Sequence, residues 1–127
     1  MLSNTKLLLI VSGLAELGLG ASLLLAPSLT AELVVGAGLA SAASVLVARV
    51  GGAALLSIGL SCWFERDRVS PASGLVAGLA VYNAVVAALL TYAAVVDGMR
   101  GFGLWPATGL HLVLLMWCAA CLRARRR

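Results

Sequence analysis

Four long apolar runs divide the chain of 127 residues, at about 6–26, 45–64, 71–96 and 104–122. Each run is close to or longer than the ~20 residues that an α-helix needs to cross the hydrocarbon core of a bilayer. In lipid a helix satisfies its own backbone hydrogen-bonding groups, which irregular chain cannot do. The pattern therefore predicts an all-α integral membrane protein, a four-helix bundle in a single membrane domain over residues 1–127.

The segment between the first two runs is apolar but is interrupted by Gly36 and Gly38. We expect a short interfacial helix over about residues 30–43, and the alternative is an apolar loop that covers the bundle. Pro27 ends the first run, because proline cannot continue a helix. A secretory signal peptide is the competing interpretation of the first 31 residues, but Glu16 interrupts its apolar core.

Composition agrees with the membrane class, since 62% of the residues are hydrophobic, 11% are charged and the mean hydropathy is +1.07. The net charge of +4 does not indicate a nucleic-acid partner, because its placement follows the predicted spans. In the four-span arrangement only two basic residues, Arg49 and Arg100, fall on the side of the membrane opposite the termini. By the positive-inside rule, both termini face the cytoplasm, and the bilayer itself is the partner of the terminal arginines. The basic residues on that side are Lys6, Arg66, Arg68, Arg123, Arg125, Arg126 and Arg127.

Polar side chains occur near the middle of every apolar run. With a helical rise of ~1.5 Å per residue, Glu16, Asn83 and His111 lie about 15, 18 and 16 Å from the cytoplasmic ends of their runs. Tyr82 falls at about the same depth, and Arg49 lies roughly 6 or 7 Å further out. A carboxyl at the midplane is costly unless it faces a partner or a wet cavity. These five residues are therefore the predicted polar network or candidate ligand site.

Two interpretations of these five polar residues stay open, and both can hold together. In the structural one, Glu16 and Arg49 form an interior ion pair, while Tyr82, Asn83 and His111 supply hydrogen bonds that fix the bundle. In the functional one, the same groups line a small cavity in which Glu16 or His111 exchanges a proton. Such a cavity could equally bind a headgroup, a quinone carbonyl or a small solute.

Thiols and the histidine are the candidates for redox or metal chemistry. Cys118 and Cys121 have CxxC spacing and, with Cys62, fall at the cytoplasmic end, where a reducing compartment favours packing over a redox role. His111 is the one histidine of the chain, so haem ligation by two histidines would need another chain. About 10 Å of helix separates it from Cys118, too far for one metal ion. No metal and no cofactor is predicted.

Small residues on two runs favour helix association. Ser12, Glu16 and Gly20 share one helical face, and Gly74 with Gly78 forms a small-xxx-small pair. Such faces let helices approach closely in a membrane. We expect a homo-oligomer or a place in a larger membrane complex.

Three short motifs accompany the four-run pattern: Arg49-Val50-Gly51-Gly52-Ala53-Ala54-Leu55-Leu56, Tyr82-Asn83, and Leu104-Trp105-Pro106 followed by His111. In outline the chain resembles small uncharacterised bacterial four-helix membrane proteins, loosely the DoxX-like ones. The resemblance implies a bacterial cytoplasmic (inner) membrane. DoxX-type proteins are associated with quinone-linked redox chemistry, but no cofactor motif here carries that role over.

A second resemblance is to the small multidrug resistance transporters, which have an essential glutamate in the first of four helices. Ala15-Glu16-Leu17 matches that feature, whereas Arg49 and His111 depart from the family pattern. This resemblance implies transport centred on Glu16, which a neutralising Arg49 would spoil.

Together these observations favour a non-enzymatic membrane protein, an accessory or interaction subunit whose bundle is fixed by the midplane polar network. No nucleophile–base pair, phosphate loop or carboxylate dyad is evident in the sequence. The alternatives are a small-solute or proton-coupled transporter centred on Glu16, and a quinone-linked thiol redox protein using Cys118 and Cys121.

Overall fold

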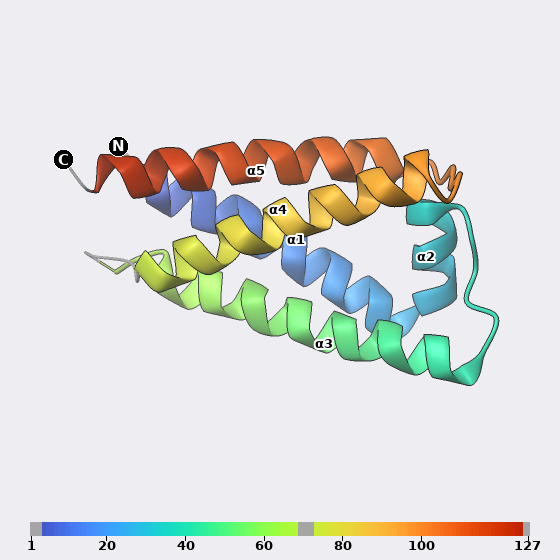
Figure 1. Ribbon diagram of the computed structural model, residues 1–127. Helices are drawn as coiled ribbons and strands as arrows, with labels where there is room; N and C mark the ends of the chain where they lie inside the picture. Colours follow the sequence, from blue (N-terminus) through green and yellow to red (C-terminus); the bar gives the residue numbers. More distant parts are fainter. Residues whose placement is uncertain (1–3, 69–72, 126–127) are drawn as a thin grey trace.

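The fold of the chain is known from a computed structural model that describes residues 4–68 and 73–125 (Figure 1). Within these residues the helices are α1 (Asn4–Leu25), α2 (Pro27–Val35), α3 (Ala42–Glu65), α4 (Ser73–Val95) and α5 (Leu104–Ala124). All except α2 are long and apolar enough to cross a membrane. The predicted all-α fold with four spans is confirmed, with span limits that shift by up to three residues. The expected start of the third span at residues 71–72 lies outside the described residues.

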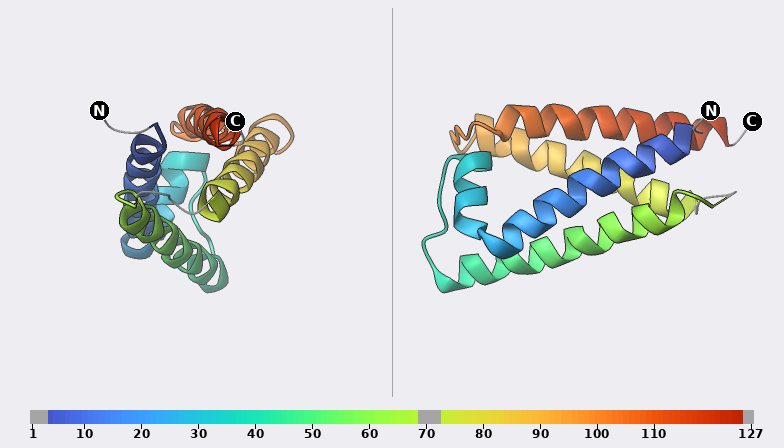
Figure 2. Two further views of the ribbon diagram at one scale, coloured as in Figure 1. Left: turned by 90° about the vertical axis from the view of Figure 1, so that its left-hand side faces the viewer. Right: turned by 180° about the vertical axis from the view of Figure 1, so that it is seen from behind.

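The start of α1 and the end of α5 lie at the same end of the bundle, as Figures 1 and 2 show. There the Lys6 Nζ atom lies 2.6 Å from Asp67 Oδ1, so the start of α1 is tied to the turn after α3. Arg66 and Arg68 lie on the same turn, and we call this the basic end. The arrangement agrees with four antiparallel crossings.

The short helix α2 differs from its predicted range of 30–43. Pro27 is its first residue, which suits a proline because the first helical N–H has no partner in the helix. Gly36 ends it with a left-handed φ of 79°, and its N–H donates to the Glu32 carbonyl. Ser41 and Ser44 then cap each other and begin α3 three residues before the predicted Val45. The sequence prediction gave too much weight to hydrophobicity and too little to these stop and start signals.

α2 runs across the end of the bundle opposite the basic end, nearly perpendicular to the long helices (Figure 1). It contacts α1, α3 and α5. The Gly103 N–H donates to the Leu33 carbonyl over 2.8 Å, which ties the loop before α5 to α2. Consequently α2 closes this end of the bundle.

α1 and α3 pack most closely, through paired glycines. A Cβ added to Gly20 would lie 2.7 Å from the Gly52 carbonyl oxygen, and one added to Gly59 would lie 3.0 Å from the Gly13 carbonyl oxygen. In each helix the two glycines are seven residues apart, about two turns, and so lie on one stripe. Close backbone approach through small residues is a common way to join membrane helices.

α4 and α5 form the second close pair, and α1 joins it to the first by touching α5 (Figure 2). Gly74 and Gly78 of α4 do not serve packing among the described residues, since a Cβ on either would meet none of their neighbouring atoms within 4 Å. A buried apolar cluster fills the half of the bundle nearest the basic end. Its members are Leu8, Leu9, Cys62, Val76, Leu79, Leu114, Cys118 and Cys121.

Candidate functional site

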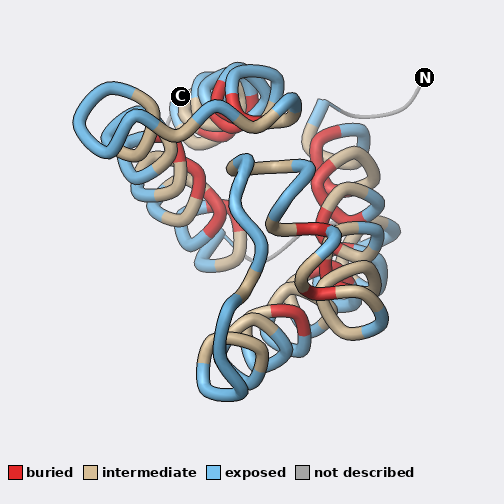
Figure 3. The backbone as a smooth tube through the Cα atoms, turned by 90° about the vertical axis from the view of Figure 1, so that its right-hand side faces the viewer, coloured by how far each residue is buried: buried red, intermediate tan, exposed pale blue. Residues whose placement is uncertain are grey.

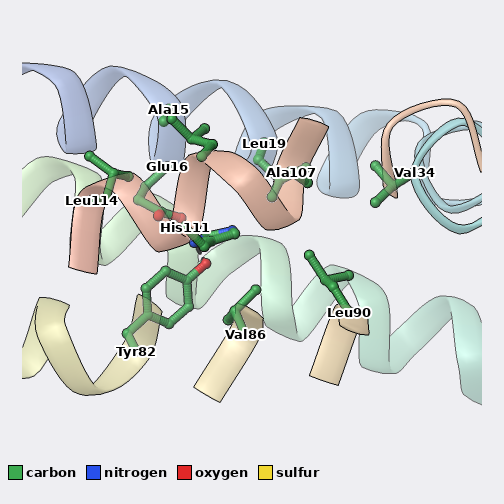
Figure 4. A pocket seen from close by; sticks show the side chains of 11 residues that line it. Ala15, Glu16, Leu19, Val34, Tyr82, Val86, Leu90, Ala107, His111 and Leu114 are labelled. Atoms are coloured by element: carbon green, nitrogen blue, oxygen red, sulfur yellow. Dashed lines mark hydrogen bonds between the residues drawn. The ribbon is translucent and has the colours of Figure 1, made fainter. Parts of the chain in front are cut away.

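Glu16 makes its contact with α4 rather than with a cation. The glycine stripe of α1 faces α3, and Glu16 lies beside that stripe on the face turned to α4 and α5 (Figure 4). Tyr82 Oη donates to Glu16 Oε2 over 3.0 Å. Glu16 is 2% exposed, so this carboxyl lies inside the bundle. Tyr82 therefore supplies a buried hydrogen bond to Glu16, as the structural interpretation expected of the midplane polar residues.

Asn83 and His111 form the second polar contact, between α4 and α5. Asn83 Oδ1 lies 2.7 Å from His111 Nδ1, and Asn83 Nδ2 donates to the Leu79 carbonyl over 2.7 Å. Both side chains are buried, with 0% and 6% exposure. A buried amide with both ends bonded holds a fixed orientation, and here it fixes the imidazole as well.

The two contacts meet through Tyr82 and His111. Their ring centroids lie 5.6 Å apart, with the planes at 79° in an edge-to-face arrangement. Such ring pairs are favourable beyond the apolar area that they bury. Glu16, Tyr82, Asn83 and His111 thus form one polar group contributed by three helices, near the middle of the spans, as their depths predicted.

A cavity of about 330 Å³ adjoins this polar group. α1, α4 and α5 supply its walls, and Val34 of α2 lines it at the end nearest α2 (Figure 4). Seen from the α2 end, the buried parts of α1, α4 and α5 face one another across the interior (Figure 3). The lining is apolar apart from Glu16, Tyr82 and His111: Ala15, Leu19, Val34, Val86, Leu90, Ala107, Leu110 and Leu114. A pocket of this kind, apolar with a few converging polar groups, is typical of small-molecule sites.

Two polar atoms at the cavity have no partner among the described residues, Glu16 Oε1 and His111 Nε2. The Glu16 contact uses Oε2 and the His111 contact uses Nδ1. Ser12 Oγ is the one fully enclosed side-chain oxygen or nitrogen in the described chain without a hydrogen bond. The two free atoms are therefore not sealed in protein, and both of their residues line the cavity.

The predicted ion pair between Glu16 and Arg49 is wrong. Arg49 is exposed and makes no salt bridge with Glu16 among the described residues. The glycine register explains why, because pairing of Gly20 with Gly52 places Arg49 opposite Leu23. Leu23 lies seven residues beyond Glu16, about 10 Å along α1. Depth alone predicted that the Arg49 side chain could reach Glu16. The glycine register between α1 and α3 and the exposed position of Arg49 on α3 rule this contact out.

The three cysteines belong to the apolar cluster. Cys62, Cys118 and Cys121 are buried free thiols, and Cys118 has 0% exposure. They lie on the basic side of the polar group and do not line the cavity. In the described residues no group of three or more His, Cys, Asp or Glu side chains could hold a metal ion. The redox role of Cys118 and Cys121 stays a prediction.

Sequence reasoning missed the contribution of α2 to the site. Val34 lines the cavity although its helix was expected three residues later and was not assigned to a ligand site. A signal was present in Pro27 and Gly36, which mark a helix that begins directly after α1 and must turn back over the bundle. The apolar wall residues carried no such signal, because they resemble the lipid-facing residues around them.

No protein-family model matches the chain, and comparison with curated proteins and with solved structures gives no match either. The resemblances to DoxX-like proteins and to small multidrug resistance transporters therefore stay predictions. The site has to be interpreted from its own geometry.

Proposed function

We propose that this multi-pass membrane protein is a non-enzymatic binding protein for a small, largely apolar molecule that carries a polar group. The observation that supports this proposal is the cavity of about 330 Å³ beside Glu16 and His111. Its apolar walls suit a hydrocarbon body, and the two unpartnered polar atoms suit a single polar group. Binding would also give these atoms the partners that buried polar groups normally have.

A pair of neighbouring positions on α4 allows a direct test of the cavity. Val86 lines it, whereas Val85 is 51% exposed and does not. Val86→Trp would fill the cavity, and Val85→Trp adds the same ring on the outside of the helix. The assay measures thermal stabilisation of the purified protein in nanodiscs by 4-hexylphenol, 4-hexylanisole and 2-octanone, because a ligand that binds the folded state raises its stability.

The proposal expects concentration-dependent, saturable stabilisation of the wild type and of Val85→Trp by at least one of the three molecules. Val86→Trp is expected to lose that effect. Equal stabilisation of both variants would mean that the molecules act through the bilayer, and it would contradict the proposal. Absence of any saturable effect in the wild type would contradict it too.

Transport centred on Glu16 is the second candidate, favoured by one observation. Glu16 has no cationic partner among the described residues, since its hydrogen bond comes from Tyr82 and Arg49 is exposed. The expected objection, that Arg49 neutralises the carboxyl, is therefore removed. Proteoliposomes with a pH gradient and a panel of lipophilic cations test this function. Glu16→Gln is expected to abolish gradient-driven uptake, and unchanged uptake in that variant would exclude proton coupling through Glu16.

We further infer that the basic end faces the cytoplasm and that the membrane is a bacterial cytoplasmic membrane. The shared end of Lys6, Arg66 and Arg68 supports this orientation through the positive-inside rule. The accessory role and the oligomer stay proposals as well, and the open face at Gly74 and Gly78 is compatible with them. Labelling of single cysteines introduced at residues 67 and 98 in intact cells tests the orientation, with only position 98 expected to react.

A further inference from the structure

We infer that the cavity selects molecules that donate a hydrogen bond, such as alcohols and phenols, and that His111 Nε2 is the atom that accepts it. This inference rests on the proposed binding function and names the class of ligand. It follows from the order of donors and acceptors around Asn83, His111 and Tyr82.

The orientation of the Asn83 amide is set by Leu79. The Leu79 carbonyl oxygen can only accept a hydrogen bond, so the Asn83 atom that lies 2.7 Å from it must be the donor Nδ2. The other end of the amide, Oδ1, then faces His111 Nδ1 at 2.7 Å. An amide oxygen can only accept, and therefore the proton of this contact belongs to His111 Nδ1.

A neutral imidazole carries one proton, and Asn83 holds it on Nδ1. Nε2 is then a bare acceptor. His111 is 6% exposed and lines the cavity, so this acceptor lies at a buried position beside an apolar space. Such an atom is satisfied by a molecule that brings a proton to it.

The protein does not supply that proton from the neighbouring phenol. Tyr82 Oη uses its proton on Glu16 Oε2 at 3.0 Å, although its ring lies edge-to-face with His111. No hydrogen bond joins Glu16 and His111 among the described residues. Nε2 is thus left for the ligand.

The consequence is selection by hydrogen-bond direction. A hydroxyl can donate to Nε2, whereas an ether, an ester or a quinone carbonyl can only accept and would leave Nε2 unpaired. Leaving a buried polar atom unpaired weakens binding by about tenfold or more. A quinone carbonyl, which the sequence allowed as a ligand, is therefore disfavoured at His111.

The first test reads the position of the ring proton directly. His111 is the one histidine of the chain, so protein labelled with ¹⁵N-histidine gives a single imidazole in nitrogen NMR spectra. In nanodiscs at pH 8 the inference expects Nδ1 to be protonated and Nε2 to be bare. A ring with its proton on Nε2 would overturn the inference and leave the binding function untouched.

The second test compares 4-hexylphenol with 4-hexylanisole, its methyl ether, which has no hydroxyl proton. The inference expects the phenol to bind the wild type about tenfold or more tightly and to shift the Nε2 resonance. In His111→Phe, anisole binding should remain and the preference should vanish. His111→Gln, whose amide can also accept, should restore part of the preference if the variant is folded.

The outcomes separate the two proposals. Equal affinity of the wild type for both molecules would overturn the selection and leave the binding function standing. A preference that persists in His111→Phe would also overturn it, because another group would then be the acceptor. If the wild type binds none of the molecules, the binding function fails and the selection fails with it.

Discussion

Gly20 and Gly52 face each other so closely across the α1–α3 contact that neither position has room for a side chain. A Cβ on Gly20 would lie 2.7 Å from the Gly52 carbonyl oxygen, and a Cβ on Gly52 would lie 2.8 Å from the Gly20 carbonyl oxygen. The same pair sets the register that separates Arg49 from Glu16. The contact therefore decides both how the helices join and which groups reach the site.

Gly20→Ala is expected to destabilise the bundle by about 1–3 kcal/mol, because the backbones must move apart to admit a methyl group. Gly18→Ala is the matched control on the same helix, since a Cβ there meets no atom within 4 Å. Unfolding of both variants in mixed micelles measures the difference. Equal stability of the two variants would show that the close approach contributes nothing.

Tyr82→Phe is expected to lower stability by about 0.6 kcal/mol, the average for hydrogen bonds between membrane helices, and by no more than about 1.7 kcal/mol, the largest value found for them. The change removes the hydroxyl that donates to Glu16 and leaves the ring against His111. Tyr92→Phe provides the control, because Tyr92 is 57% exposed. If Tyr92→Phe costs as much under the same denaturation assay, the Glu16 contact is not a stabilising one.

Gly101→Ala is expected to loosen α2 from the end of the bundle. A Cβ at Gly101 would overlap the Val34 carbonyl, whereas one at Gly38 meets no atom within 4 Å. Hydrogen exchange of the Gly103 amide, which donates to Leu33, reports on this attachment. Exchange should be at least tenfold faster in Gly101→Ala than in Gly38→Ala, and identical rates would contradict the closure by α2.

The stability of the basic end is expected to depend on acid pH through Asp67. The hydrogen bond from Lys6, together with the charges of Lys6 and Arg66, holds the pKa of this carboxyl below its ordinary value. A lowered pKa means stabilisation that is present above the unfolded pKa of about 4 and is lost as pH falls through the folded pKa.

Thermal unfolding of the wild type and of Asp67→Asn between pH 7 and pH 3 measures this contribution. Near neutral pH the wild type should be more stable than Asp67→Asn, and the difference should shrink toward pH 3. The difference should be small even at neutral pH, because Asp67 is exposed and exposed ion pairs contribute little. Asp97→Asn, the same change in the exposed turn before α5, controls for net charge. A difference that grows as pH falls would have the wrong sign for this linkage.

The sequence predicted the four spans well because length and hydrophobicity dominate a chain in lipid. It also placed Glu16, Tyr82, Asn83 and His111 at one depth, since helical rise converts residue number directly into height. Depth says nothing about rotation, however. Arg49 is exposed and the glycine register separates it from Glu16 by about 10 Å along α1, while Tyr82 lies next to Glu16.

Rotation and register come from side-chain packing, which periodicity cannot resolve when nearly every residue is apolar. The glycines of α1 and α3 mark the helix faces that pack together. Gly74 and Gly78 form a similar small-residue pattern in the sequence, yet they pack against nothing in the described chain. Which small-residue stripe is used depends on the whole bundle. The cavity was hidden for the same reason, because its wall residues resemble residues that face lipid.

α2 lies across one end of the bundle, and the apolar cluster fills the half nearest the other end. We therefore expect a guest molecule to arrive sideways, out of the hydrocarbon phase. The bilayer then acts as its reservoir, and the concentration that the protein experiences is set by the partition coefficient of the guest rather than by its level in water. Occupancy should follow the mole fraction of guest in the lipid, so that adding more membrane at constant total guest empties the protein.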